Sequence, residues 1–570
     1  MNKGDSKDLD ASEAGLGPAT DVQLVAVPTH VDGEKVMGAA VAPKQTNRHL
    51  LPRHIQLMAF SGAIGTGLFV GSGSVLARAG PLGLVLGYAI YALLVWSTFN
   101  AMGEMVVWLP VDGSFVVFAH AYLDDAWGFA LGWLYTVTNS LSAAGEVAAV
   151  AAIFNYWTDS VNSAVYVAIV STSLVALNLF GVRIYGEGEF YFSLFKIFLI
   201  LGLLVFTCRF ITGLPQLQVA DSAPQVVVMV GGNPQHDAFG FRYWKNPGPF
   251  NEYIGTGSWG NFLGFWSVFV QAAFAFGGPD YIALAAGEAR APRRVMPSVF
   301  KRVIYRLSVF YVLGVLAVGI LVPYNDPDLG SNKPGAGASP FVIGAVRLGI
   351  PILPDIINAV LLTSAWSCSL ELFYASTRSL YALAVDGKTP KLFRFTWRGV
   401  PTVCVLTVWA ITWIAFMSAS NNSLTVFNWL TNIVGSGNLL IYCIFHITYI
   451  RFRRAQKAQG VTDDQRPWFR RHQYTYSIIS LAFYILIFIT NGFAVFTEGR
   501  WSVASFIFAY FSLGLFVVCY AGYKIFSRAP MVKLASVALH AGRTEVDMDD
   551  GYVEPEPKTR TGRFFRWLWG

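Results

Sequence analysis

Stretches of about 20 apolar residues recur along this chain, and a helix of that length crosses a lipid bilayer. Hydrophobic residues make up 54% of the 570 and charged residues only 13%, a balance typical of a membrane protein. The stretches between charges and turn residues predict an all-α polytopic membrane protein with twelve transmembrane helices. These lie near residues 54–79, 82–108, 127–157, 163–181, 188–212, 260–288, 299–322, 351–385, 402–419, 425–450, 475–495 and 502–526.

Basic residues gather in alternate loops between the predicted helices. The loops at 290–302, 388–398 and 451–471 are rich in Lys and Arg, whereas the intervening loops hold far fewer. Because cytosolic loops carry the excess of Lys and Arg, we expect these loops and both termini to lie in the cytosol. Membrane orientation therefore explains the net charge of +7, and we do not expect nucleic-acid binding.

The chain divides into a membrane domain and two tails. Residues 1–47 are polar and mixed in Ala, Gly and Pro, which predicts a disordered cytosolic tail without a cleavable signal peptide. Residues 48–526 form the membrane domain, and 527–570 form a cytosolic C-terminal tail. The N-terminal tail holds candidate acceptors for ubiquitin-ligase machinery, against the alternative of an unmodified linker: Lys3, Lys7, Lys35 and Lys44.

The five cysteines lie within or beside apolar stretches: Cys208, Cys368, Cys404, Cys443 and Cys519. Free cysteines at such positions usually serve as small core residues, so we expect neither a disulfide nor a metal site. The sequence also has no convergent pattern of nucleophile and base. A membrane-embedded enzyme is therefore the least favoured function.

Two of the predicted helices are interrupted by glycine-rich runs in corresponding places. The first run is Gly62–Leu68, and the second is Phe276–Asp280, in which proline lacks a backbone donor. Unwound backbone at membrane depth must line a protected cavity, and paired interruptions indicate the substrate site of an inverted-repeat transporter. For Gly71 and Gly73 we favour a simpler role in close helix packing.

The helix ends created by such a break carry opposite partial charges. Free N–H groups attract a carboxylate, and free C=O groups attract an ammonium. We therefore expect a substrate carboxylate at the Thr66–Gly67 break and its ammonium on the carbonyls of residues 274–278. A zwitterionic amino acid presents both groups on one carbon, so two opposed breaks predict an amino acid substrate. The other expected partner is membrane lipid, which surrounds the spanning helices. The candidate substrate-binding residues in the breaks are Ala63, Ile64, Gly65, Thr66, Gly67, Phe276, Gly277 and Gly278.

Lys196 and Glu146 are ionisable residues well inside predicted helices. Lys196 has apolar neighbours on both sides, and Glu146 lies in the small-residue run Ala-Ala-Gly-Glu-Val-Ala-Ala. Charged side chains at membrane depth are costly and usually functional, so both are candidates for proton coupling. The alternatives are a lysine that snorkels to the interface and a glutamate held in a buried structural hydrogen bond. Glu104, near a helix end, is expected to pair with an arginine.

Several longer motifs follow one another from about residue 48 to about residue 530. They include GAIGTGLFVGSG at 62–73, GEMVVWLPVDGSF at 103–115, GVRIYGEGEFYFSLFK at 181–196, AAGEARAPRRVMP at 285–297, STRSLYALAVDGKTPKLF at 376–393 and VFNWLTNIVG at 426–435. Together they resemble the yeast (fungal) amino acid transporter family of the amino acid–polyamine–organocation superfamily.

The resemblance implies a five-plus-five inverted repeat in which helices 1 and 6 are broken. The repeats would span residues 54–212 and 260–450, and two added helices would span 475–526. It also implies proton-driven uptake of amino acids at the plasma membrane, with a proton gradient in place of any cofactor.

Four residues acquire roles through the resemblance. Lys196 matches the superfamily's coupling group, and Glu146 matches a glutamate that faces the substrate. Phe274 matches an aromatic position that covers the substrate. Asp280 stands where relatives commonly have Gly-Thr-Glu, whereas this chain has Gly-Pro-Asp; the carboxylate is kept but shortened, so Asp280 is a candidate for both substrate binding and proton coupling. Glu371 departs from the family pattern and could pair with Lys196.

Two other functions stay open at this point. One is an amino acid sensor that does not transport, and the other is an exchanger or exporter of polyamines or related organic cations, for which the acidic groups at 146 and 280 would be suited. The residues do not identify which amino acid is carried.

Overall fold

The computed structural model describes residues 29–31, 34–36 and most of 55–539. Within the last range it leaves out 57–58, 60–61, 63, 112, 159, 181–191, 193–194, 205–239, 278, 290, 330–338, 398, 498, 529 and 538. The predictions for residues 540–570 and for most of the N-terminal tail, including Lys3, Lys7 and Lys44, therefore lie outside the described residues, whereas Lys35 belongs to the second described strand.

Helices form most of the described chain. Its first half contains β1 (Thr29–Val31), β2 (Glu34–Val36), η1 (Gly67–Gly71), α2 (Ser72–Trp108), α3 (Ser114–Tyr122), α4 (Asp125–Phe154), α5 (Ser163–Phe180), α7 (Arg242–Lys245), α8 (Gly257–Trp266), α9 (Val268–Ala275), α10 (Pro279–Ala285) and η2 (Ala286–Glu288). The two strands pair antiparallel with Thr29 opposite Val36.

The second half continues the helical pattern. It contains α11 (Pro292–Leu321), α12 (Pro340–Arg347), α13 (Leu353–Val385), η3 (Lys391–Arg394), α14 (Thr402–Thr412), η4 (Trp413–Ala419), α15 (Ser423–Ala458), η5 (Asp463–Gln465), α16 (Gln473–Thr490), η6 (Phe493–Phe496), α17 (Val503–Ser527) and η7 (Leu534–Ser536).

Nine helical runs of the described chain are long and apolar enough to cross a membrane: Gly67–Trp108, Asp125–Phe154, Gly257–Ala285, Pro292–Leu321, Leu353–Val385, Thr402–Ala419, Ser423–Ala458, Gln473–Thr490 and Val503–Ser527. Two shorter apolar helices are Ser163–Leu179 and Phe195–Leu204. The chain is therefore a multi-pass helical membrane protein, while the number of twelve spans and the inverted repeat stay predictions.

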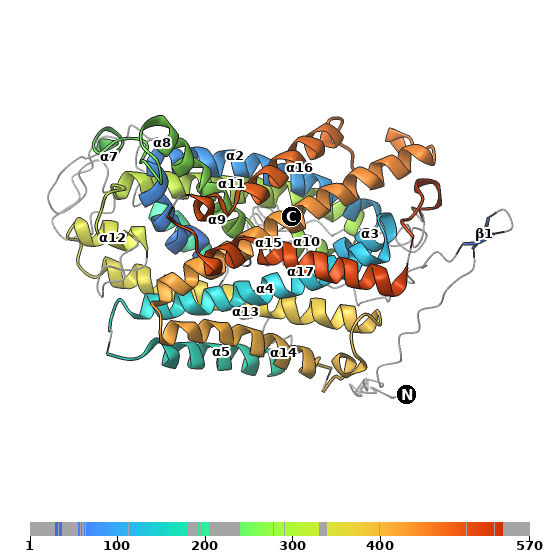
Figure 1. The fold of residues 1–570 in the computed structure, drawn as a ribbon, viewed down its shortest axis with the longest axis horizontal. Coiled ribbons are helices and arrows are strands. Elements are labelled where there is room, and N and C mark those ends of the chain that lie inside the picture. The colour runs from blue at the N-terminus through green and yellow to red at the C-terminus, as the bar shows by residue number, and fades with distance from the viewer. Residues whose placement is uncertain are drawn as a thin grey trace, which may run out of the picture.

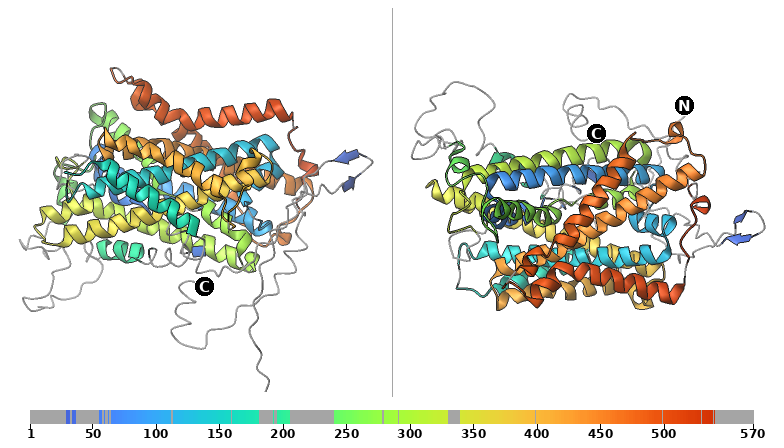
Figure 2. Two further views of the ribbon diagram at one scale, coloured as in Figure 1. Left: turned by 90° about the horizontal axis from the view of Figure 1, so that it is seen from below. Right: turned by 45° about the horizontal axis from the view of Figure 1, so that its top comes forward.

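The helices run roughly along one axis and pack in two groups. In one group α4 lies beside α13, with α5 and α14 packed against them; in the other, α2 lies beside α11 (Figure 1). Helix α15 packs on α4 and reaches α2, and it crosses α4 obliquely (Figure 2). The meeting of α2 with α15 therefore links the two groups.

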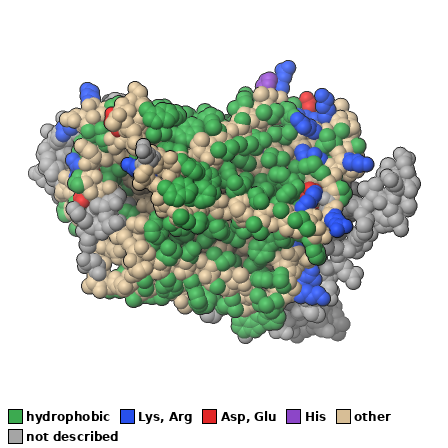
Figure 3. Space-filling model, viewed as in Figure 1, with side chains coloured by type: hydrophobic (Ala, Val, Ile, Leu, Met, Phe, Trp, Pro, Cys, Tyr) green, Lys and Arg blue, Asp and Glu red, His purple; other side chains and the backbone are tan. Residues whose placement is uncertain are grey.

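Apolar side chains cover the middle of the molecular surface, and Lys and Arg lie toward the two ends of the helices (Figure 3). Large apolar residues are exposed along helix faces, among them Leu93, Ile169 and Val518, which are 68%, 63% and 71% exposed. In water such a surface would drive aggregation, whereas in a bilayer the lipid tails cover it.

Gly80 divides the run Gly67–Trp108 at the point where the sequence predicts the end of one helix and the start of the next. Its φ of 71° and ψ of 170° are not helical. The loop at Pro249–Asn251 docks into this break, where Leu82 N donates to Pro249 O at 2.9 Å and Asn251 N donates to Ala79 O at 3.3 Å. The backbone groups freed by the break are thereby satisfied.

We expect Gly80→Ala to reduce the amount of folded protein strongly. An added Cβ would lie 2.7 Å from Phe250 Cα, a backbone atom that cannot rotate away, and left-handed φ costs a non-glycine residue about 1–3 kcal/mol. Gly113→Ala is the matched control, because Gly113 also has a φ of 71° but its nearest neighbour, Val117 Cγ2, lies at 3.7 Å. Fluorescence size-exclusion chromatography would measure both; equal profiles would contradict the prediction.

Residues 531–539 pack across the ends of several helices. Trp108 Nε1 donates to Leu539 O at 2.8 Å, Val532 N donates to Leu123 O at 2.9 Å, and Gln459 Nε2 donates to Val537 O at 2.8 Å. Leu539 is buried. This segment, which follows α17, joins the ends of α2, α3 and α15, on the side of the bundle predicted to be cytosolic.

Candidate functional site

The first predicted break is a bend in the chain at Ile64 and Gly65, after which helical structure resumes at Thr66. The resumed segment begins as the π-helical turn η1, Gly67–Gly71. Gln271 on α9 donates from Nε2 to Gly67 O at 3.2 Å. The turn η1 is therefore hydrogen-bonded to α9, the helix that ends at the second break.

The second predicted break separates α9 from α10. Helix α9 ends at Ala275, and Phe276 has a ψ of 77°, outside the helical range. Helix α10 then begins at Pro279. The two breaks lie against each other, since an added Cβ on Gly67 would lie 3.0 Å from the Ala275 Cα.

Glu146, from the middle of α4, reaches the first break. Its two carboxylate oxygens lie 3.2 and 3.3 Å from Thr66 N, which donates to them. The glutamate is only 2% exposed, and it also interacts electrostatically with Lys196. Gly65 leaves the space that the carboxylate fills, because a Cβ there would lie 2.5 Å from Glu146 Oε1. The Glu146 carboxylate thus accepts a hydrogen bond from the N–H group at the start of the resumed helix, a position where anions bind favourably.

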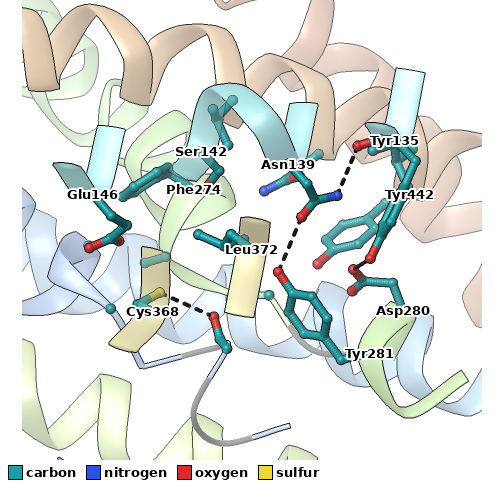
Figure 4. A pocket seen from close by; sticks show the side chains of 18 residues that line it. Tyr135, Asn139, Ser142, Glu146, Phe274, Asp280, Tyr281, Cys368, Leu372 and Tyr442 are labelled. Atoms are coloured by element: carbon teal, nitrogen blue, oxygen red, sulfur yellow. Dashed lines mark hydrogen bonds between the residues drawn. The ribbon is translucent and has the colours of Figure 1, made fainter. Parts of the chain in front are cut away.

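The two breaks and the helices α4, α13 and α15 enclose a pocket (Figure 4). Its cavity volume is only about 30 Å³, so in this conformation the lining side chains leave room for little more than water. The lining residues are Gly62, Gly65, Gly67, Tyr135, Asn139, Ser142, Glu146, Phe274, Ala275, Gly277, Asp280, Tyr281, Cys368, Leu372, Val434, Asn438, Ile441 and Tyr442.

Asp280 lies at the end of the pocket opposite Glu146 (Figure 4). It accepts a hydrogen bond from Tyr135 Oη at 3.0 Å and is 7% exposed. Next to it, Tyr281 Oη donates to Asn139 Oδ1 at 3.3 Å. The pocket therefore carries one carboxylate at each end, with tyrosine and amide groups between them.

The carbonyl groups of the second break already accept hydrogen bonds from the protein. Tyr311 Oη donates to Ala275 O at 2.6 Å, and Tyr442 Oη donates to Phe276 O at 2.7 Å. We expected these carbonyls to receive a substrate ammonium. Their remaining lone pairs and the Asp280 carboxylate can still accept hydrogen bonds from a substrate ammonium at this end.

The structure brings only some of the predicted site residues to the pocket. Gly65, Gly67, Phe274, Gly277, Asp280 and Glu146 line it. Three others lie beside it: Ile64 is buried, Thr66 contributes its backbone N–H, and the Phe276 ring packs 4.3 Å from the Tyr311 ring. Ala63 and Gly278 lie outside the described residues.

Lys196 and Glu371 are both buried, at 1% and 3% exposed, and neither lines the pocket. Glu371 lies against the first break, because a Cβ on Gly62 would be 2.8 Å from Glu371 Oε1. The pairing of Glu371 with Lys196 stays a prediction. Glu104 lies 3.8 Å from Arg453 Nη1, as expected of a helix-end ion pair.

Sequence reasoning identified Glu146 but missed the other polar residues of α4 and α15 that line the pocket. Tyr135, Asn139, Ser142 and Glu146 recur at helical spacing on one face of α4. On α15, Asn438 and Tyr442 are one turn apart. The spacing of polar residues within an apolar helix would have identified both faces.

A pocket at paired helix breaks in a multi-pass helical protein defines a membrane transporter of small molecules rather than an enzyme. Comparison with known families supports this class directly, because the family model described as "Amino acid permease" matches residues 54–536. The chain belongs to the amino acid permease family.

Named relatives are similar along almost the whole chain. The proline-specific permease of Emericella nidulans is 39% identical, over 92% of this chain and 93% of its own length. The proline-specific permease of Saccharomyces cerevisiae is 38% identical over 95% and 83%. The dicarboxylic amino acid permease of the same yeast is 35% identical over 88% and 81%. Relatives at this level of identity thus differ in the substrates that they are named for.

Proposed function

We propose that this protein carries L-amino acids into the cell by proton-coupled uptake across the plasma membrane. The pocket between the two breaks would open in turn to each side of a twelve-helix membrane domain with cytosolic termini. The observation that carries the proposal is the contact between the Glu146 carboxylate and the Thr66 N–H.

This contact supplies a reason for a proton and an amino acid to be carried together. A substrate carboxylate and ionised Glu146 would compete for the same helix start. Protonation removes the charge of Glu146 and weakens its hydrogen bond from Thr66 N. The substrate carboxylate can then take that N–H group, so a proton on Glu146 favours substrate binding.

The other end of the substrate would meet Asp280. An ammonium group beside this carboxylate is favoured by charge and by hydrogen bonding, and Gly277 lies in the same part of the pocket. Lys196 would tune Glu146 through their electrostatic interaction. In this arrangement each charged group of a zwitterion has an oppositely charged or polarised partner.

We propose L-proline as the principal substrate. Two relatives that are similar over most of this chain are named proline-specific. The described lining residues include Phe274, Tyr281 and Tyr442, which suit an apolar ring, and they include no Lys or Arg. A second substrate carboxylate would therefore have no cationic partner among them, which argues against a dicarboxylic substrate.

Uptake of labelled L-proline into a fungal host that lacks its own proline transport would test the proposal. We expect accumulation to fall about tenfold when a protonophore collapses the proton gradient, since each proton carried down its gradient drives the amino acid. We also expect unlabelled L-proline to compete with the label and L-glutamate not to compete.

The same assay distinguishes the alternative functions. A sensor would bind L-proline without accumulating it. An exchanger would take up label only when the cells are preloaded with substrate, and a polyamine carrier would respond to putrescine rather than L-proline. Accumulation that is unaffected by the protonophore would refute proton coupling while leaving the substrate proposal intact.

A further inference from the structure

His446 is a fully buried titratable residue that lies outside the pocket. It is on α15, one helical turn beyond Tyr442, which lines the pocket, and it is 0% exposed. Burying a polar side chain is costly unless its hydrogen bonds are made. Both ring nitrogens of His446 are therefore expected to have hydrogen-bond partners.

The contacts of Thr98 fix the protonation of the His446 ring. Thr98 Oγ1 lies 3.1 Å from Leu94 O, 3.0 Å from Tyr484 Oη and 3.1 Å from His446 Nε2. A threonine hydroxyl has one hydrogen, and the Leu94 carbonyl can only accept it. For all three bonds to form, Tyr484 Oη and His446 Nε2 must both donate to Thr98.

The network therefore assigns the hydrogen of the neutral ring to Nε2 and leaves Nδ1 as a bare acceptor. Within the described part of the chain, His446 Nδ1 has no hydrogen-bond partner. Leaving a buried nitrogen without a hydrogen bond destabilises the folded protein. A functional group that must bind a proton at one stage and release it at another would have this arrangement.

His446 lies between the pocket and a carboxylate at the predicted cytosolic end. Toward the pocket, the Tyr484 ring is 5.7 Å from both the Tyr442 and the His446 rings. Toward the other end, Tyr449 Oη donates to Glu104 Oε2 at 2.6 Å. The titratable and charged groups on His446's helix and on the helices packed against it are Arg78, Tyr88, Tyr91 and Glu104 on α2, His120 and Tyr122 on α3, Asp125, Tyr135 and Glu146 on α4, Tyr442, Cys443, Tyr449, Arg451, Arg453, Arg454 and Lys457 on α15, Tyr474, Tyr476 and Tyr484 on α16, and Tyr510, Cys519, Tyr520, Tyr523 and Lys524 on α17.

The bond between Thr98 and His446 also crosses the contact between the two helix groups. Thr98 belongs to α2, which lies beside α11, and His446 belongs to α15, which lies on α4. Relative movement of such groups is the usual basis of alternating access. Separation of α2 from α15 would break this bond and admit water to Nδ1.

We propose that His446 is a proton-carrying residue of the transport cycle. A pocket carboxyl group loses its O–H bond as the Nδ1–H bond of His446 forms, through water admitted when α2 and α15 separate. The Nδ1–H bond then breaks and the proton passes to water on the side of Glu104, which restores the neutral ring. This inference rests on the proposed proton coupling.

The test compares His446→Gln with Tyr484→Phe in full-length protein reconstituted into liposomes. Glutamine keeps an N–H donor for Thr98 but cannot carry a proton, whereas Tyr484→Phe removes one bond of the same network and leaves His446 intact. Labelled L-proline is measured in two modes, accumulation driven by an imposed pH gradient and exchange against internal L-proline. Proton entry is followed with a trapped pH dye.

We expect His446→Gln to lose proton entry and to reduce driven accumulation by about tenfold or more, as for loss of a group that acts in proton transfer. Its exchange and that of Tyr484→Phe should stay within about twofold of the unaltered protein, since exchange needs no net proton transfer. Tyr484→Phe should also keep its proton entry.

If His446→Gln still accumulates labelled L-proline in response to the pH gradient, with unaltered proton entry, the proposal would be overturned. If His446→Gln does not fold, Thr98→Val carries the test, because it removes the acceptor of Nε2–H but keeps the histidine. It should shift the pH dependence of accumulation and preserve exchange, and an unshifted profile would overturn the proposal. An unaltered protein that moves L-proline without protons would instead refute the proposed coupling.

Discussion

Gly65→Ala is expected to reduce uptake by about 100-fold, because displacement of a site group by about 1 Å can cost that much. An alanine Cβ at this position would lie 2.5 Å from Glu146 Oε1 and 2.7 Å from Cys368 Sγ. Real carbon atoms do not approach so closely, so Glu146 would have to leave the Thr66 N–H or the bend at the first break would have to widen. Either change removes the arrangement that receives the substrate carboxylate.

Gly73→Ala is the matched control, since it lies in the same motif. Its added Cβ would meet Pro340 Cδ at 3.4 Å, an ordinary contact, and uptake should stay within about twofold. Labelled L-proline uptake would be compared at equal surface amounts of the two variants. Normal uptake by Gly65→Ala would place the substrate away from the first break.

Glu146→Gln should make substrate binding independent of pH between about 5 and 7, because it removes the proton that the proposal couples to binding. In the unaltered protein, protonation of Glu146 frees the Thr66 N–H, so binding should strengthen as pH falls. Glutamine is neutral at every pH, so the variant should bind L-proline at pH 7 as the unaltered protein binds it at low pH. Accumulation driven by a pH gradient should be lost.

Ser142→Ala is a suitable control for this variant. Ser142 lines the pocket one turn from Glu146 on α4 but carries no titrating group at these pH values. It should keep the pH dependence of binding, whatever its effect on affinity. Calorimetric titration of purified protein with L-proline at several pH values would measure both, and a Glu146→Gln variant whose affinity still follows pH would contradict the role of Glu146.

The sequence located the breaks because glycine and proline act locally. Gly62–Leu68 and Phe276–Asp280 lie where the helices are interrupted, since a missing donor or an added bend has its effect within one turn. The partners of the breaks could not be found in this way. Thr66 and Glu146 are 80 residues apart in sequence, and their contact depends on how α4 packs.

The predicted role of the second break illustrates the same limit. Its carbonyl groups were expected to be free for an ammonium, but Tyr311 and Tyr442 already donate to two of them. Both tyrosines lie in apolar stretches that predict helices without indicating which face points inward. Packing of α11 and α15 against α9 and α10 decides which side chains meet the break.

The packing of residues 531–539 affects how shortened forms of this protein should be interpreted. A truncation just after α17 would remove more than a tail, because Trp108 would lose its acceptor and Gln459 two of its acceptors. Loss of transport in such a form would therefore not show that the C-terminus regulates the permease. A fluorescent protein or an affinity tag fused beyond Leu539 leaves this folded segment intact.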